Sequence, residues 1–366
     1  MSIPKQSQAL IVVDKGKVAV QTVDIPQAGE GEIVVKVEAV ALNPTVPATL
    51  MYYHRQHWKH RDFVSPPGAG LGCDFSGRVV QLGQGVHNVK EGDRVAGFIH
   101  GGKDEKHGSF AGQFKASEYL KTEATLVWKV PDSVDAEEAA ALGGIAPHTA
   151  FQALNLRLGI PQPSKPISTS ESLLVWGGST SVGLYAVQLA ALAGYRVVAT
   201  SSPKNFDLVK KYGASAVFDY ADDATPSKIQ HEFPELALAL DTISERGTTL
   251  KTAQSFKNKG HIVVLLPPSD EGLDNYPDVK VEFTLVYTVL GKEFNFAGNA
   301  FFPAMPKDKK AIEEWSEYVP SLIESGKFKA NPLWRQVGGL AKVNDGMNLL
   351  KEGKNSAQKV TFNFGA

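Results

Sequence analysis

The stretch from Gly177 to Gly183 reads Gly-Gly-Ser-Thr-Ser-Val-Gly and lies between two apolar runs. The run before it, Leu173–Trp176, has the length of a buried strand, and the run after it, Leu184–Ala193, has the length of a helix. A pyrophosphate group needs backbone N–H groups that point at it, a helix N-terminus beneath it and no bulky side chain in the way. The stretch therefore predicts a phosphate-binding turn. An ordinary strand–helix turn capped by serine is the alternative, because Thr180 stands where the G-x-G-x-x-G pattern has its middle glycine.

Hydroxyl groups and a positive charge follow the next apolar run, Arg196–Thr200. The residues Ser201-Ser202-Pro203-Lys204-Asn205 contain no acid. A site specific for NAD places Asp or Glu here to accept from the ribose 2′-hydroxyl, whereas a 2′-phosphate needs donors and a cation. The pattern therefore favours NADPH, with Tyr220 as a further contact on the adenosine side. The alternative is a Ser-Pro helix cap with a solvated lysine, and Tyr220 would then be a residue at the edge of the core.

The elements that must position these residues alternate between apolar and amphipathic runs. The predicted strands are Ser172–Trp176, Arg196–Thr200, Ala216–Asp219, Leu236–Asp241 and His261–Leu265. The predicted helices are Leu184–Ala193, Phe206–Tyr212, Pro226–Phe233 and Thr248–Phe256. This alternation predicts an α/β fold with a doubly wound parallel sheet, which also favours the phosphate-binding interpretation of the glycine-rich turn.

The N-terminal third of the chain is rich in β-branched residues instead. Its predicted strands are Ala9–Val13, Val18–Val23, Ile33–Ala41, Gly72–Leu82 and Arg94–Ile99. Glycine or Gly-Asp turns separate them, so we expect a partly open barrel or a sandwich. Further helices are predicted over Val134–Leu142, Thr149–Leu156 and Lys307–Glu324, and a last strand over Ala357–Phe364.

The length of the chain and the change from a β-rich to an alternating pattern together predict two domains. A chain of 366 residues is too long for one ordinary core. We expect a β-rich domain that begins with residues 1–131 and is completed by residues 299–366, with an inserted α/β domain over residues 132–298.

The charge balance and the cysteine count exclude several classes of protein. The chain has 38 basic and 39 acidic residues, whereas a protein that neutralises nucleic-acid phosphates needs a basic excess. Residues 1–10 lack the apolar run of a signal peptide, and no stretch approaches the roughly 18 apolar residues of a membrane span. We therefore expect a cytoplasmic protein without nucleic-acid or membrane partners. Cys73 is the single cysteine, so no cysteine cluster exists to bind zinc.

These segments together resemble the medium-chain dehydrogenase/reductase superfamily, and within it the zinc-free quinone-reductase and enoyl-reductase branch. The segments that carry the likeness are Ala41–Pro44, Gly72–Gly77, Glu91–Val95, Ala139–Leu154, Gly177–Gly183, Ser202–Phe206, Phe218–Tyr220 and Gly346–Lys359. The chain is most similar to the trans-acting enoyl reductases that serve fungal polyketide synthases. The resemblance implies a Rossmann domain inserted into a GroES-like catalytic domain.

The resemblance also implies site residues. Asn43 would lie near the nicotinamide ribose, Thr149 would face the carboxamide, and Leu265 and Leu266 would flank the nicotinamide. The implied cofactor-binding set is Gly178, Ser179, Thr180, Ser181, Val182, Gly183, Ser201, Ser202, Lys204, Tyr220, Leu265, Leu266, Ser356 and Ala357.

One segment departs from the family's pattern. The family usually follows Asn-Pro closely with an Asp-Trp-Lys-type string, but here an extra run over 46–57 separates Asn43-Pro44 from Trp58-Lys59-His60. Lys59 is a candidate catalytic residue, unless the extra run keeps it away from the substrate cleft. The run also holds Tyr52 and Tyr53, which are proton donors or packing residues. His54, His57 and His60 recur every three residues and form either a metal-binding face or a solvated basic face.

The expected function is zinc-independent hydride transfer from NADPH to an activated carbon–carbon double bond, in an enone or an enoyl thioester. Quinone or carbonyl reduction by the same fold is the first alternative, and a nucleotide-binding module without turnover is the second. The resemblance implies a small-molecule substrate and a polyketide synthase as a partner. The sequence leaves both a monomer and a homodimer open.

Overall fold

The computed structural model describes residues 3–14, 17–44, 67–102, 108–109, 119–168, 170–296 and 300–364. The chain divides into two compact units, each with its own sheet. The first unit combines Met1–Ile145 with Tyr287–Ala366, and the second consists of Ala146–Val286. None of the described helices is long and apolar enough to cross a membrane.

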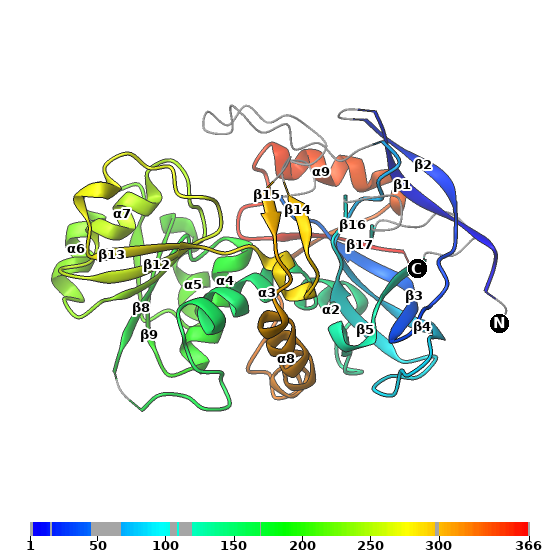
Figure 1. Ribbon diagram of the computed structural model, residues 1–366. Helices are drawn as coiled ribbons and strands as arrows, with labels where there is room; N and C mark the ends of the chain where they lie inside the picture. The colour runs from blue at the N-terminus through cyan, green and yellow to red at the C-terminus, as the bar shows by residue number, and fades with distance from the viewer. Residues whose placement is uncertain are drawn as a thin grey trace. The chain divides into compact units, whose positions relative to one another are not determined.

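The sheet of the first unit joins the two ends of the chain (Figure 1). Its order is β16-β17-β3-β4-β5-β7, and β6 also pairs with β3. These strands are β3 (Glu32–Ala41), β4 (Asp74–Leu82), β5 (Arg94–Phe98), β6 (Tyr119–Glu123), β7 (Trp128–Lys129), β16 (Leu333–Gln336) and β17 (Lys359–Asn363). Two antiparallel hairpins, β1–β2 (Gln6–Asp14, Lys17–Asp24) and β14–β15 (Phe294–Phe296, Ala300–Phe302), lie outside this sheet. Since β17 pairs with β3, the C-terminal segment is part of the N-terminal sheet.

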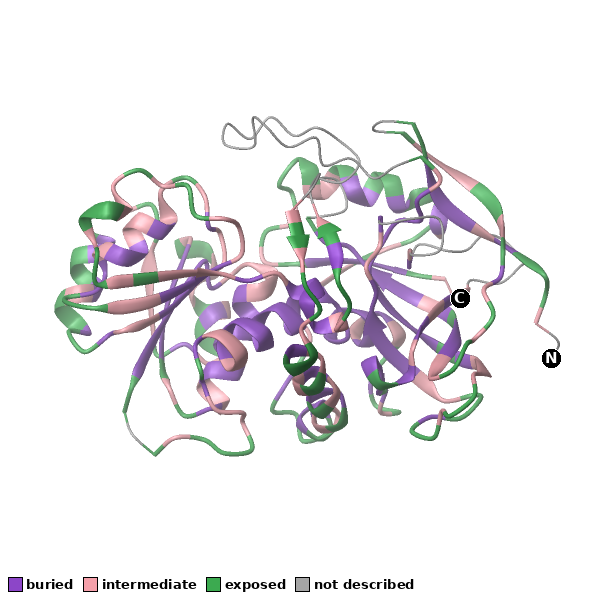
Figure 2. Ribbon diagram, in the orientation of Figure 1, coloured by how far each residue is buried: buried purple, intermediate pink, exposed green. Residues whose placement is uncertain are grey.

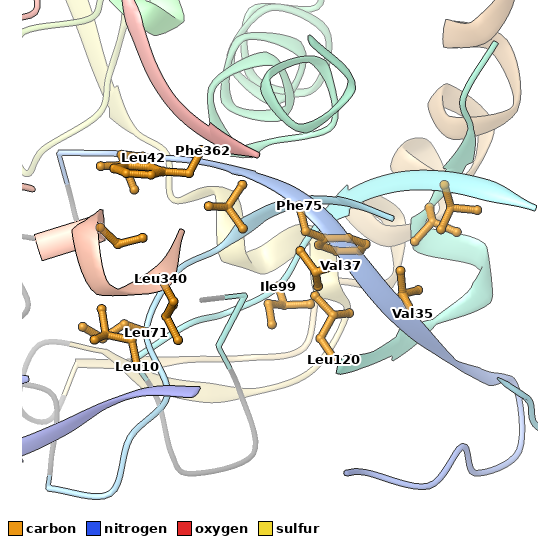
Figure 3. Close-up of a cluster of buried hydrophobic side chains, with 14 of the residues drawn as sticks. Leu10, Val35, Val37, Leu42, Leu71, Phe75, Ile99, Leu120, Leu340 and Phe362 are labelled. Atoms are coloured by element: carbon orange, nitrogen blue, oxygen red, sulfur yellow. The ribbon is translucent and has the colours of Figure 1, made fainter. Parts of the chain in front are cut away.

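All the apolar residues of strand β3 are buried, whereas Lys36 is exposed and Glu32 and Glu38 are half-buried. On one face, Val35, Val37 and Phe75 belong to the main core of this unit, together with Leu42 and Phe362 (Figure 3). On the other face, Ala39 and Ala41 contact alanines of α2 (Ala136–Leu142). The short side chains on both elements allow the helix to approach the sheet closely.

Helix α2 belongs to the first unit, although the predicted boundary at residues 131 and 132 assigns it to the α/β domain. The Asp135 side chain caps the helix by accepting from the Glu138 N–H at 2.9 Å. Arg335 then ties the helix to β16, with 2.6 Å contacts to Asp135 and Glu137. The helix packs through its alanine face on the sheet of the first unit. The boundary between the first and the second unit therefore lies after Ile145.

The second boundary also differs from the expected one, at residues 298 and 299. The segment from Tyr287 onward belongs to the first unit because its aromatic side chains pack there. The Tyr287 ring stacks on His100 with centroids 3.8 Å apart, and Phe294 meets His100 edge to face at 5.3 Å.

The second unit has a six-stranded parallel sheet with the order β10-β9-β8-β11-β12-β13. The strands are β8 (Ser172–Trp176), β9 (Arg196–Ser201), β10 (Ala216–Asp219), β11 (Leu238–Asp241), β12 (Gly260–Val264) and β13 (Val279–Phe283). The helices are α4 (Ser181–Leu192), α5 (Phe206–Lys211), α6 (Thr225–Glu232) and α7 (Thr248–Gln254). The central strand β8 is buried along its whole length (Figure 2). The edge strand β13 was absent from the predicted strands, because its charged residues Lys280 and Glu282 interrupt the apolar run.

The remaining helices and helical turns lie outside the elements given so far. Helix α3 (Ile145–Phe151) continues into a π-helical turn (Gln152–Arg157), where the sequence predicted one helix over Thr149–Leu156. Helix α8 spans Pro306–Glu324 and packs on β7, and α9 spans Val343–Lys351. Short 3-10 turns lie at Ala124–Leu126, Pro203–Asn205, Leu273–Asn275, Val286–Leu290 and Leu340–Lys342.

Candidate functional site

The glycine-rich turn lies at the carboxyl end of β8, at the point where the order of the parallel sheet reverses. Strand β8 pairs with β9 on one side and with β11 on the other. Ligands of doubly wound sheets bind in the crevice at such a switch point. Gly177 begins the turn with a φ of 82°, a left-handed conformation that favours glycine. Helix α4 then starts at Ser181, so the turn leads directly into the N-terminus of a helix.

Two further glycines of the turn are required by close packing. A Cβ at Gly183 would lie 2.2 Å from the Gly177 carbonyl oxygen, and a Cβ at Gly178 would lie 2.8 Å from the Ala199 Cβ. Both distances are far below a normal van der Waals contact. The turn therefore packs against the start of α4 and against β9 too closely for a side chain at either position. The three glycines are buried, and the partly exposed residues of the turn are Ser179, Thr180, Ser181 and Val182.

The Thr180 hydroxyl is used within the turn itself. It accepts from the Gly183 N–H at 2.9 Å, which caps α4, and donates to the Thr242 Oγ1 at 2.9 Å. Thr242, just after β11, in turn donates to the Trp176 carbonyl oxygen at 2.9 Å. Thr180 therefore connects the turn to the neighbouring strand across the switch point. The resemblance implies Thr180 as a cofactor-binding residue, whereas here its hydroxyl proton is directed to Thr242.

The end of β9 presents the predicted hydroxyl and lysine side chains. The buried Ser201 hydroxyl donates to the Ser202 carbonyl at 3.1 Å, and Asn205 Nδ2 donates to the Ser202 Oγ at 3.3 Å. Lys204 is exposed and forms no salt bridge within the described part of the chain. Tyr220 is 50% exposed, and its N–H donates to the Ser201 carbonyl at 3.3 Å. Ser202, Lys204 and Tyr220 thus lie at the ends of two adjacent strands.

A buried carboxylate shapes the loop after β11. Asp241 accepts from the N–H groups of Ile243 and Ser244 at 3.0 and 2.9 Å, and from two threonine hydroxyls of α7. Burial raises the pKa of Asp241, although these hydrogen bonds favour its ionised form. Ser244 has a left-handed φ of 56°, and its Oγ accepts from the Leu265 N–H at 2.8 Å. The loop after β11 thereby fixes the half-buried Leu265 and Leu266 that follow β12.

Thr149 lies on α3 and is buried in the second unit. The π-helical turn that follows is anchored to the strand end near β13, where Thr284 Oγ1 donates to the Gln152 Oε1 at 2.8 Å. This bond holds the carboxyl end of α3 within the second unit.

Asn43, in the first unit, belongs to a buried polar cluster. The Asn43 Oδ1 accepts from the Lys359 ammonium at 2.5 Å, and the same ammonium lies 2.9 Å from the Asp74 carboxylate. Asn43, Asp74 and Lys359 are 3%, 0% and 2% exposed. The Asn43 Nδ2 has no hydrogen-bond partner among the described residues. A buried donor left without an acceptor costs about 1–3 kcal/mol, so this group requires an explanation.

Ser356 and Ala357 lie in the turn that enters β17. Ser356 is exposed, and Ala357 adopts a left-handed φ of 54°. Such a conformation costs a residue with a Cβ roughly 1–2 kcal/mol. Strained backbone of this kind is found frequently where a segment contacts a ligand.

The donor set of the described residues does not fit a zinc site. Cys73 is buried, its Sγ lies 3.5 Å from the Tyr287 hydroxyl, and burial raises its pKa to about 12. A thiol that stays protonated is a poor metal ligand. No group of three His, Cys, Asp or Glu side chains within the described ranges is arranged to bind a metal ion.

Several candidates lie outside the described residues. These are Tyr52, Tyr53, Lys59 and the histidines His54, His57 and His60, which fall within residues 45–66. Their predicted roles therefore remain predictions from the sequence.

The predicted residues are distributed over the two units. The second unit brings together the turn at 177–183, the end of β9 with Tyr220, and Leu265 and Leu266, all at the carboxyl edge of one parallel sheet. The first unit holds Asn43 and the turn at 356–357.

The sequence did not single out Asp241, Thr242 or Ser244. Their position directly after a predicted central strand was the available signal, because ligand sites form at the carboxyl ends of such strands. Asp74 and Lys359 lie within the longer segments Gly72–Gly77 and Gly346–Lys359, and nothing in their spacing links them to Asn43.

Comparisons with known proteins agree with this architecture. Residues 29–132 match the family described as alcohol dehydrogenase GroES-like domain, and residues 181–302 match the family described as zinc-binding dehydrogenase. The chain is 37% identical over 362 residues to a trans-enoyl reductase of Alternaria alternata, a match that covers 97% of this chain and 98% of that protein.

Solved structures of similar fold cover nearly the whole of this chain. One is the enoyl reductase CurK, with a TM-score of 0.74 and 18% identity over 98% of this chain and 99% of that one. Another is a mycobacterial protein solved in complex with NADPH, with a TM-score of 0.70 and 21% identity over 98% of this chain and 99% of that one. At these identities the likeness concerns the fold.

Proposed function

This chain belongs to the medium-chain dehydrogenase/reductase superfamily, and we propose that it is an NADPH-dependent reductase of activated carbon–carbon double bonds. The observation that carries the proposal is the 37% identity, over nearly the whole chain, to a trans-enoyl reductase. The substrate class proposed is an enone or an enoyl thioester.

The turn after β8 fits the pyrophosphate of a dinucleotide. Glycine is required at 178 and 183 by close packing. The N–H groups of Gly178, Thr180 and Gly183 are bonded to the Thr200 carbonyl, the Gly177 carbonyl and the Thr180 hydroxyl. We assign the pyrophosphate to the turn at residues 178–183, with the N–H groups of Ser179 and Val182, at the start of α4, as the proposed donors. Thr180 contributes through its position rather than through its hydroxyl, which is used by Gly183 and Thr242.

The end of β9 fits a 2′-phosphate better than a 2′-hydroxyl. The exposed Lys204 supplies a cation, Ser202 a hydroxyl, and Tyr220 a half-exposed ring for the adenosine side. The buried Ser201 donates its proton to backbone, so its proposed part is to hold Ser202 in place. No carboxylate from Ser201 to Asn205 would accept from a ribose 2′-hydroxyl.

When bound, NADPH supplies the hydride from its nicotinamide C4. In the proposed site Leu265 and Leu266 flank the nicotinamide, Thr149 faces the carboxamide, and Ser356 and Ala357 close over the cofactor. A double bond conjugated to a carbonyl becomes an enolate on reduction, so its oxygen needs a donor and its α-carbon needs a proton. The protein's part is to orient the reactants, to exclude water and to place polar groups at the developing charge. Asn43 and Thr149 are the proposed polar groups, and Lys59 is a candidate on the sequence alone.

The proposed reaction is independent of zinc, and this is directly measurable. The single cysteine is buried and protonated at neutral pH, so a catalytic zinc would lack its usual thiolate ligand. We expect metal analysis of the purified protein to find well under one zinc per chain, and a chelator to leave activity and melting temperature unchanged. Stoichiometric zinc that is lost together with activity would contradict this.

The resemblance to trans-acting enoyl reductases supports a polyketide synthase as the partner that presents the substrate. The chain, as proposed, acts on an acyl group carried by that separate protein. A monomer and a homodimer are both compatible with this role.

The test of the proposed function uses NADPH deuterated at C4, supplied with enones, enoyl thioesters, quinones and ketones. We expect deuterium at the β-carbon of a saturated carbonyl product, which is the result of conjugate reduction. Mass spectrometry and NMR of the product locate the label. NADPH oxidation without enzyme is the control.

Other positions of the label separate the alternatives. Deuterium on a carbinol carbon would identify a carbonyl reductase, and rapid NADPH oxidation by quinones alone would identify a quinone reductase. Tight NADPH binding without turnover of any acceptor would identify a nucleotide-binding module.

A further inference from the structure

The buried cluster of Lys359, Asp74 and Asn43 is assembled by three neighbouring strands of the first unit. Lys359 is the first residue of β17, Asp74 is the first residue of β4, and Asn43 follows the end of β3. Strand β3 lies between the other two, with Ala41 opposite both Thr361 and Asp74. The Leu42 N–H donates to the Val360 carbonyl at 2.9 Å, which continues the pairing to the position before Asn43.

Asp74 is held in place by contacts other than the one with Lys359. Its Oδ1 accepts from the Ile145 N–H at 2.8 Å, at the start of α3. A Cβ at Gly144 would lie 2.1 Å from the Asp74 Oδ2, so only glycine allows this approach. The carboxylate is therefore fixed by backbone, and the ammonium of Lys359 is fixed by the carboxylate.

The ammonium of Lys359 determines which way the Asn43 amide points. An ammonium has only donors, so the amide must present its oxygen to Lys359 and its NH₂ group in another direction. That NH₂ group is the buried donor without a partner among the described residues. The Asn43 NH₂ group is therefore a buried donor with a fixed orientation and no acceptor among the described residues. A bound ligand that carries an acceptor atom could satisfy it.

We propose that Lys359 is a positioning residue, which orients the Asn43 amide so that its NH₂ group donates to an acceptor oxygen of the bound cofactor or substrate. The acceptor is a hydroxyl or a carbonyl oxygen, which occurs both on the nicotinamide half of NADPH and on the conjugated substrate. This inference rests on the proposed function. Lys359 itself touches neither reactant, and acts only through Asn43.

The test compares three variants with the wild-type protein. Asn43→Asp keeps an oxygen for Lys359 but removes the NH₂ donor, Lys359→Met removes the ammonium, and Lys359→Arg keeps a cation with donors. Lys121→Met is the matched control, because Lys121 is a paired lysine in the same sheet, 2.7 Å from Glu32. The measurements are NADPH Kd by fluorescence, kcat and KM for the best acceptor, and melting temperature.

We expect Asn43→Asp to lose about 10- to 100-fold in kcat/KM or in NADPH affinity while its melting temperature stays near that of the wild type. Lys359→Met should show the same kinetic loss together with a lower melting temperature, and Lys359→Arg should recover most of the kinetic loss. A weaker Kd for NADPH places the acceptor on the cofactor. An unchanged Kd with a lower kcat/KM places it on the substrate.

Wild-type values of both Kd and kcat/KM in a folded Asn43→Asp would overturn the inference. So would a Lys359→Arg protein that is as stable as the wild type but no faster than Lys359→Met. If the wild-type protein reduces no acceptor, the proposed function fails, and the NADPH Kd of Asn43→Asp alone decides the inference: a weaker Kd supports it and an unchanged Kd overturns it.

Discussion

Replacing Gly183 with alanine is expected to abolish NADPH binding, and with it all turnover. The new Cβ would lie 2.2 Å from the Gly177 carbonyl oxygen and 2.9 Å from Gly178 backbone atoms. Neither neighbour is the end of a mobile side chain, so the turn or the start of α4 must shift. Because the proposed function assigns the pyrophosphate to this turn, a shift of about 1 Å would remove several of the proposed hydrogen bonds together. We expect the Kd for NADPH to rise by more than about 100-fold, as measured by fluorescence titration.

Gly29→Ala is the matched control for this substitution. A Cβ at Gly29 would meet only the end of the Glu32 side chain, at 2.8 Å, and that side chain can move aside. Circular dichroism should show both variants folded, since the shift at Gly183 is local to the turn. A Gly183→Ala protein that binds NADPH with the wild-type Kd would show that the ligand does not contact this turn.

Replacing Lys204 with alanine is expected to weaken NADPH binding by about 10- to 150-fold, while NADH binding changes little. A charge-assisted contact to the 2′-phosphate is lost, and NADH has no phosphate at that position. The loss should lie nearer the lower limit, because Lys204 is exposed and solvent screens its charge. The measurement is the Kd of both cofactors for the variant and for the wild type.

Lys210→Ala is the control for a general change in surface charge, since Lys210 is an exposed lysine of α5, away from the end of β9. It should leave both affinities unchanged. Equal losses for NADPH and NADH in Lys204→Ala would mean that Lys204 does not contact the 2′-phosphate. If the wild-type protein preferred NADH, this would contradict the assignment of the 2′-phosphate to the residues at the end of β9.

Local patterns in the sequence were sufficient for most of the second unit. The predicted strands Ser172–Trp176 and Ala216–Asp219 have the same bounds in the structure, and the other three differ by at most two residues at either end. Buried strands that alternate with helices leave a strong periodic signal, because each element must bury its own apolar surface. The glycine-rich turn was equally visible, since the conformation and the close packing that it needs exclude other residues.

The edge strand and the boundaries between units needed tertiary structure. Strand β13 has one neighbour and alternating charges, so its sequence alone does not separate it from a loop. The alanine-rich helix α2 has no local feature that tells which sheet it covers; its contact with Ala39 and Ala41 decides this. Likewise, the stack of Tyr287 on His100 joins residues that are far apart in the chain.

For the polar groups of the site, too, some features could be predicted from the sequence and others depend on the tertiary structure. Residue types alone were enough to propose Lys204 and the serines for a phosphate, because charge and hydroxyl content can be read without coordinates. Which hydroxyl is available is decided by the fold, which directs the Thr180 proton to Thr242. The orientation of the Asn43 amide depends on Lys359, 316 positions later in the chain, and on the register that places β17 beside β3. Sequence determines which donors and acceptors exist, but hydrogen bonds act over about 3 Å, and only tertiary structure brings residues so distant in the chain within that range.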